Sequence, residues 1–102
     1  MKKLFIILMI VVMSSFVQAA EKAPLKVFVS VDMEGIWGVV NGDQTSSETR
    51  DYGYARKWMA EDVNAVVEGL FEAGATEVIV NDSHGSMRNI LPSDFHQKAS
   101  LI

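Results

Sequence analysis

Residues 25–31 (Leu-Lys-Val-Phe-Val-Ser-Val) and residues 76–80 (Thr-Glu-Val-Ile-Val) decide the fold. Both runs are short, apolar and rich in valine, which is typical of buried β-strands. Residues 54–73 lie between them and follow a helical period instead. Strand, helix and strand in this order form a βαβ unit, whose two strands are parallel neighbours joined by a right-handed crossover. The predicted fold class is therefore α/β, with a βαβ unit of a parallel sheet.

The predicted helix has one apolar face. Gly74 follows it, at the position where glycine commonly ends a helix. Before the helix, residues 36–52 are rich in Gly, Asn, Asp, Ser and Thr, which predicts a long loop of the kind that is more often functional or disordered than idle. The residues predicted to share the buried helix face are Met59, Val63, Val66, Val67, Leu70 and Phe71.

Two strands and one helix cannot cover both faces of a parallel sheet, which needs helices on each side. The last residues, 99–102 (Ala-Ser-Leu-Ile), are typical of the start of another element. We therefore expect residues 21–102 to be the N-terminal part of a larger α/β domain, truncated here.

Residues 1–20 predict a secretory signal peptide. Lys2 and Lys3 precede ten apolar residues, and a Val-Gln-Ala stretch at 17–19 predicts cleavage after Ala19 or Ala20. The apolar run is shorter than the roughly 20 residues that a membrane span needs. We expect secretion across the inner membrane, a periplasmic or extracellular location, and no stable membrane anchor after cleavage.

The charge and cysteine content exclude several classes of function. Seven of the nine Lys and Arg residues and all 13 Asp and Glu residues follow residue 20, so the mature chain has a net charge of −6. This charge disfavours a nucleic-acid partner or an anionic lipid surface. Since the chain has no cysteine, disulfides, thiol catalysis and Cys-bound metals are excluded. Any metal must bind His, Asp or Glu.

Acidic residues and a histidine follow the two predicted strands. Asp32 and Glu34 come after the first strand, and Asp82 and His84 after the second. Because sites in such sheets lie beyond the carboxyl ends of the strands, we expect these residues side by side. Asp32, Glu34 and His84 would then offer two oxygens and one nitrogen, a set that suits zinc or manganese. The alternative is a solvated acidic turn beside a histidine with local hydrogen bonds.

Other polar and aromatic residues have simpler interpretations. Ser83 lacks a Gly-x-Ser-x-Gly context, so it is not predicted to be a nucleophile. His96 is predicted to lie on the surface. Trp37 and Trp58 are predicted to be packing residues, and Arg56 with Lys57 to form a solvated helix face.

Two stretches carry a family resemblance: residues 29–36 (Val-Ser-Val-Asp-Met-Glu-Gly-Ile) with Gly38, and residues 78–85 (Val-Ile-Val-Asn-Asp-Ser-His-Gly). They resemble the N-terminal part of the zinc-dependent D-aminopeptidases of the DppA type, and the similarity extends over residues 26–102. It implies an α/β metallopeptidase that releases N-terminal D-amino acids from short peptides. It also implies two zinc ions and a homo-oligomeric ring.

The resemblance implies that Asp32, Glu34 and His84 are metal ligands and that Asp82 supports them without binding the metal. A zinc-activated water would attack the scissile carbonyl. The family pattern continues beyond Ile102 with further ligands and the catalytic histidine, so no catalytic residue is assigned in this chain. Two alternatives stay open: an inactive truncated product, or another metal-dependent hydrolase such as a phosphoesterase. The phosphoesterase class usually has Asp-x-His where this chain has Glu34.

Overall fold

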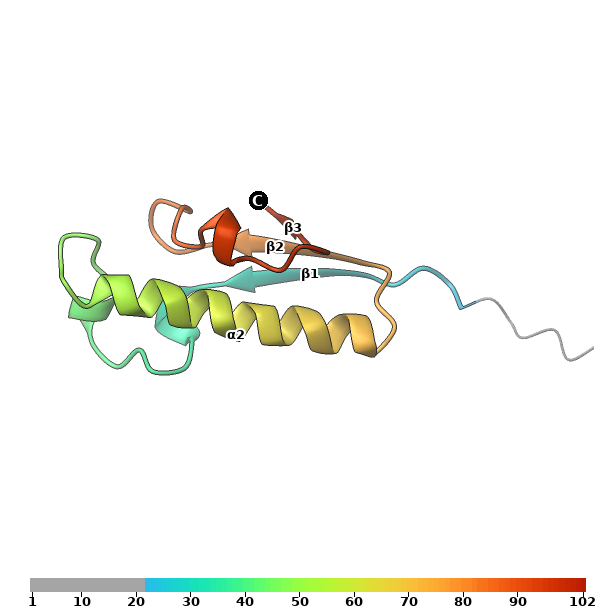
Figure 1. The fold of residues 1–102 in the computed structure, drawn as a ribbon, viewed down its shortest axis with the longest axis horizontal. Coiled ribbons are helices and arrows are strands. Elements are labelled where there is room, and N and C mark those ends of the chain that lie inside the picture. The colour runs from blue at the N-terminus through green and yellow to red at the C-terminus, as the bar shows by residue number, and fades with distance from the viewer. Residues whose placement is uncertain (1–21) are drawn as a thin grey trace, which may run out of the picture.

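The structure is a computed structural model that describes residues 22–102, so the predicted signal peptide lies outside the described residues (Figure 1). Residues 22–102 form three strands and one long helix, in the order β1, α2, β2, β3. Three short 3-10 turns lie in the connections, at Met33–Gly35, Gly42–Gln44 and Pro92–Asp94. The bounds of the main elements are Lys26–Val31 (β1), Tyr52–Glu72 (α2), Glu77–Asp82 (β2) and Ser100–Leu101 (β3).

The three strands form one parallel sheet in the order β1-β2-β3. Lys26 pairs with Glu77 at one end of the β1–β2 ladder and Val31 pairs with Asp82 at the other. The predicted α/β class and βαβ unit are confirmed. β3 forms within residues 99–102, where another element was expected to start.

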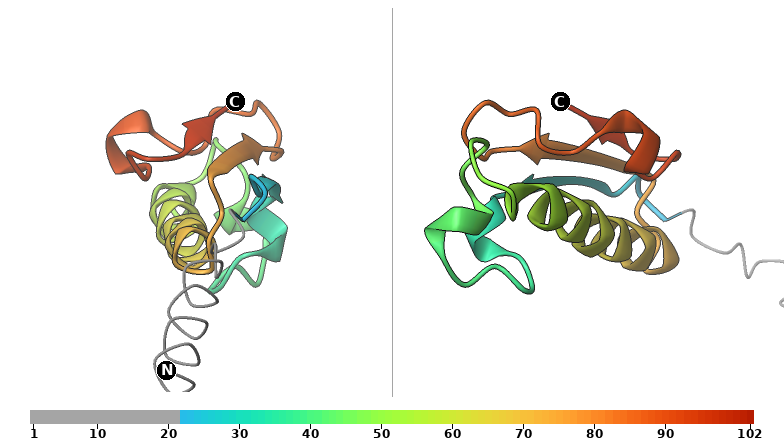
Figure 2. Two further views of the ribbon diagram at one scale, coloured as in Figure 1. Left: turned by 90° about the vertical axis from the view of Figure 1, so that its right-hand side faces the viewer. Right: turned by 60° about the vertical axis from the view of Figure 1, so that its left-hand side comes forward.

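α2 packs along one face of the sheet, and the core lies between them (Figures 1 and 2). Val66 departs from the predicted helix face, since its side chain is 49% exposed. It lies about 100° around the helix from the fully buried Val67, which places it at the edge of the contact. In its place α2 buries two small residues, so its buried face consists of Ala55, Met59, Ala60, Val63 and Val67. Among residues 22–102, no helix is long and apolar enough to cross a membrane.

Three predictions about the burial of single residues need correction. His96 is half-buried rather than on the surface, because its Nε2 bonds Glu68 Oε2 at 2.7 Å and its ring stacks on Phe71. This hydrogen bond holds the pKa of Glu68 below its ordinary value. Trp37 is 70% exposed, with its ring set edge-on to half-buried Trp58 at 5.8 Å.

The third correction concerns Arg56, which is half-buried while Lys57 is exposed as predicted. The guanidinium of Arg56 lies over the Tyr52 ring and donates to two carbonyls of the segment after β2: Nε to Asn89 O at 2.7 Å and Nη2 to Arg88 O at 3.1 Å. Its long side chain reaches across to another segment, which the helical period alone cannot indicate.

Gly74 ends α2 as predicted, with φ at +102°. Two hydrogen bonds close the helix end: Ala75 N donates to Leu70 O at 2.9 Å and Gly74 N to Phe71 O at 3.0 Å. This pair of bonds is the Schellman motif, which places its C′ residue in the left-handed region.

We expect Gly74→Ala to lower the free energy of unfolding by about 1 kcal/mol, because an L side chain is strained at this φ. Nothing lies within 4 Å of the added Cβ, so the loss comes from the backbone alone. Gly69→Ala is the matched control: it lies in the exposed interior of the same helix and should stabilise by about 0.5–1 kcal/mol. Urea unfolding followed by circular dichroism measures both, and a stabilising Gly74→Ala would contradict the assigned helix end.

Candidate metal centre

Asp32 and Glu34 are placed by the end of β1. Asp32 is still extended, at φ −121° and ψ 140°, and the chain then turns through Met33–Gly35. Gly35 N closes this turn by donating to Asp32 O at 3.0 Å. Met33 is fully buried in the core, so the two carboxylates on either side of it remain exposed. An apolar residue between two acids thus presents both acids at the same surface.

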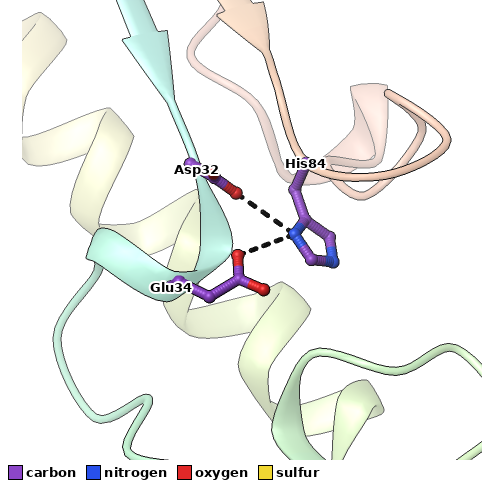
Figure 3. A group of neighbouring side chains, drawn as sticks. All are labelled: Asp32, Glu34 and His84. Atoms are coloured by element: carbon purple, nitrogen blue, oxygen red, sulfur yellow. Dashed lines mark hydrogen bonds and ion pairs between the residues drawn. The ribbon is translucent and has the colours of Figure 1, made fainter. Parts of the chain in front are cut away.

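The end of β2 brings His84 to the same place. Ser83, the first residue after β2, bonds the carbonyl of Val31 twice, through its N–H at 2.9 Å and its hydroxyl at 2.8 Å. This tie holds the two strand ends together, and it gives Ser83 a structural part rather than a nucleophilic one. His84 follows immediately and faces the turn after β1 (Figure 3).

The three predicted ligands converge. His84 Nδ1 lies 3.1 Å from Asp32 Oδ1 and 2.9 Å from Glu34 Oε2 (Figure 3). One donor atom from each residue lies within 4.8 Å of the others. The His84 side chain is 14% exposed, whereas both carboxylate side chains are 57% exposed. The cluster therefore has a covered nitrogen and two oxygens open to solvent.

The other ring nitrogen of His84 has a main-chain partner. Nε2 lies 2.8 Å from the carbonyl oxygen of Thr45, which can only accept a hydrogen bond. This carbonyl favours a proton on Nε2, while Nδ1 faces the two carboxylates. Histidines that bind metals are commonly oriented in this way, by donating the second N–H to a carbonyl or carboxylate.

Charge shapes the protonation of the cluster. Burial lowers the pKa of His84, but the Thr45 carbonyl, Asp32 and Glu34 together raise it, and the net pKa lies above the ordinary value. The pKa of Asp32 is lowered, first by its hydrogen bond with Glu34 and also by His84. Two carboxylates facing one nitrogen favour a positive charge between them, which either a proton on Nδ1 or a metal cation can supply.

Comparison with known proteins places this chain in a family. A family model described as D-aminopeptidase matches residues 25–102. The chain belongs to the D-aminopeptidase family. The D-aminopeptidase of Bacillus subtilis (strain 168) is 41% identical over 78 residues, which cover 76% of this chain and 28% of that protein.

A solved structure supports the same relationship. It is described as the Zn-dependent D-aminopeptidase DppA from Bacillus subtilis, a self-compartmentalizing protease. It matches with a TM-score of 0.75 at 41% identity, over 76% of this chain and 28% of that one. The chain thus spans about 28% of the length of these D-aminopeptidases. The family that matches is one of D-aminopeptidases and not one of phosphoesterases.

Asp82 lies behind the cluster and is 2% exposed. Its Oδ2 accepts from Asn89 N at 2.6 Å and Ile90 N at 3.0 Å, and its Oδ1 from Asn89 Nδ2 at 2.8 Å and His84 N at 3.3 Å. Asp82 therefore touches the main chain of His84 rather than its ring. It folds the segment after β2 back onto the strand end.

Sequence reasoning missed two residues that hold this arrangement. Asn89 is 2% exposed, and its amide also donates to His84 O at 2.6 Å and accepts from the Tyr52 hydroxyl at 2.5 Å. No local pattern distinguishes it. Thr45 acts through its carbonyl, so its side chain could give no signal, although Asn41 and Gln44 have the spacing of a capping box that predicts an ordered turn there.

Two cavities flank the cluster of Asp32, Glu34 and His84. One of about 340 Å³ opens beside Glu34 and is lined by Val39, Val40, Asn41, Gly42 and Thr45. The other, of about 250 Å³, lies beside His84 and has more hydroxyl groups, from Thr45, Ser46, Ser47, Tyr52 and Ser86. The first cavity thus reaches the Glu34 side of the cluster, and the second reaches the His84 side.

Proposed function

We propose that Asp32, Glu34 and His84 bind zinc in the active site of an aminopeptidase that releases N-terminal D-amino acids from short peptides. The observation that carries this proposal is the convergence of their three donor atoms within 4.8 Å, at the carboxyl end of parallel strands. Membership of the D-aminopeptidase family and the zinc dependence of the Bacillus subtilis relative support it.

The donor set fits zinc. Catalytic zinc sites commonly have three protein ligands from His, Asp and Glu and leave the fourth position to water. His84 is oriented to bind through Nδ1, and the exposed Asp32 and Glu34 leave one side open. The family resemblance favours two zinc ions that share a carboxylate, and the second ion would need donors beyond these three.

When bound, zinc supplies a water activated near neutral pH and polarises the scissile carbonyl. The residues of this chain position the reaction. Asp32 and Glu34 would neutralise the cation, and Asp82 fixes the main chain that carries His84. The cavity beside Glu34, with apolar walls from Val39 and Val40, would receive a small side chain of the peptide.

Location and assembly are part of the proposal. We propose that residues 1–20 direct export across the inner membrane, so that the mature protein acts in the periplasm or outside the cell; N-terminal sequencing of the secreted protein would test this. The Bacillus subtilis relative is described as self-compartmentalizing, which supports a homo-oligomer here. Light scattering after size-exclusion chromatography measures the assembly.

The decisive experiment compares hydrolysis of D-alanyl and L-alanyl p-nitroanilide by the zinc-loaded protein. We expect release from the D-isomer, loss of activity after chelation, and recovery with zinc. Zinc binding without any turnover would instead favour the inactive alternative. Asp32→Asn and His84→Ala should abolish the turnover. Activity that survives both substitutions would refute the ligand assignment, and turnover of a phosphodiester without any peptide would favour the alternative hydrolase.

A further inference from the structure

Gln44 is a buried amide in a polar loop. It is 8% exposed, whereas Val40 beside it is 84% exposed, so the loop turns a polar side chain inward and an apolar one outward. Its Oε1 accepts from Val40 N at 2.7 Å and from Asn41 N at 3.1 Å, and its Nε2 donates to Gly38 O at 2.9 Å. One side chain thus satisfies three main-chain groups of residues 38–41.

These bonds fix the turn that leads to His84. The turn Gly42–Gln44 begins with Asn41 and Gln44 in a reciprocal capping box. Thr45 comes directly after Gln44, and its N–H returns to Gly42 O at 3.1 Å. The direction of the Thr45 carbonyl therefore follows from the turn that Gln44 closes, and this carbonyl lies 2.8 Å from His84 Nε2.

The Thr45 carbonyl opposes a strong local preference. Asp32 and Glu34 both lie near Nδ1 and would draw the proton of a neutral imidazole to that nitrogen. An imidazole protonated at Nδ1 cannot bind zinc there, because a metal needs the free electron pair. The carbonyl on the opposite side favours the tautomer with the proton on Nε2.

We propose that Gln44 is a positioning residue, which holds the Thr45 carbonyl against His84 Nε2 and so keeps Nδ1 available to a metal. This inference rests on the proposed zinc site. The side chain of Gln44 bonds only main-chain groups of residues 38–41 and no metal ligand. It therefore acts through the main chain of the turn. Loss of the support behind a ligating histidine typically weakens metal affinity 10–100-fold.

The test uses Gln44→Met, which keeps the length of the side chain and removes all three hydrogen bonds. In the zinc-free chain, at a pH where His84 is neutral, long-range ¹⁵N–¹H spectra should move from the Nε2–H toward the Nδ1–H tautomer. Zinc affinity, measured by competition with a chromophoric chelator, should fall at least about tenfold. Gly74→Ala, at the far end of α2, is a stability control that should change neither quantity.

Gln44→Asn keeps the loop polar, but its amide is one methylene too short to reach Val40 N, Asn41 N and Gly38 O together. The tautomer should therefore shift and zinc affinity should fall in this variant as well. A folded Gln44→Met with unchanged tautomer and affinity overturns the proposal. Should Gln44→Met fail to fold, Gln44→Asn decides, and a folded asparagine variant with unchanged tautomer and zinc affinity overturns the proposal. The tautomer is read without zinc, so it tests Gln44 even if the unaltered chain binds no zinc and the proposed function fails.

Discussion

Asp82→Ala should lower the free energy of unfolding by about 3 kcal/mol, the largest stability loss we expect in this chain. The carboxylate is 2% exposed and accepts four hydrogen bonds, from His84 N, Ile90 N and both N–H groups of Asn89. Alanine leaves these donors buried and without their acceptor, and each such donor is costly. Urea unfolding followed by circular dichroism measures the difference.

Asp94→Ala is the matched control for Asp82→Ala. Asp94 is exposed, and among residues 22–102 its carboxylate accepts only from the neighbouring Ser93 hydroxyl. Its removal should change stability by less than about 0.5 kcal/mol. A loss in Asp82→Ala as small as that of the control would contradict the view that Asp82 organises the segment that carries His84.

The fold was predictable because hydrophobic period and length distinguish its main elements. Both long strands were predicted from valine-rich runs, and Gly74 marks the helix end that the structure has. β2 continues two residues further than predicted, because Asn81 and Asp82 pair with Ser30 and Val31. Asn81 and Asp82 are polar, so the local sequence does not predict that the strand includes them. Pairing with β1 determines where β2 ends. β3 has two residues, too few for any period.

The cluster was predictable because one rule of topology suffices: parallel strands bring their carboxyl ends together. Asp32, Glu34 and His84 needed only that rule. The contacts that support them were not predictable in the same way. Thr45 lies 39 residues from His84 in sequence, and it bonds His84 through its main-chain carbonyl. Every residue has such a carbonyl, so the amino-acid type at position 45 does not indicate this contact. Asn89 joins a helix and a strand end through an amide that resembles any loop asparagine.

His84→Ala should weaken zinc binding at least about 100-fold, since losing a ligand costs more than losing the support behind one. Asp32→Asn and Glu34→Gln should weaken it strongly as well, because each removes one charge from the cluster. Both carboxylate side chains are 57% exposed, so these two substitutions should leave the zinc-free fold intact. Competition with a chromophoric chelator measures affinity, and circular dichroism verifies the fold.

The matched control for His84→Ala is His96→Ala. His96 bonds Glu68 and stacks on Phe71, and it lies outside the cluster of donors. The His96→Ala variant should lose some stability and keep full zinc affinity.

Zinc also gives a second readout, because a ligand that binds only the folded state raises stability by RT ln(1 + [zinc]/Kd). The unaltered chain and His96→Ala should be stabilised by added zinc, whereas His84→Ala should not. If zinc stabilises His84→Ala as much as the unaltered chain, the metal binds elsewhere and the carboxylates with His84 form only a hydrogen-bonded surface cluster.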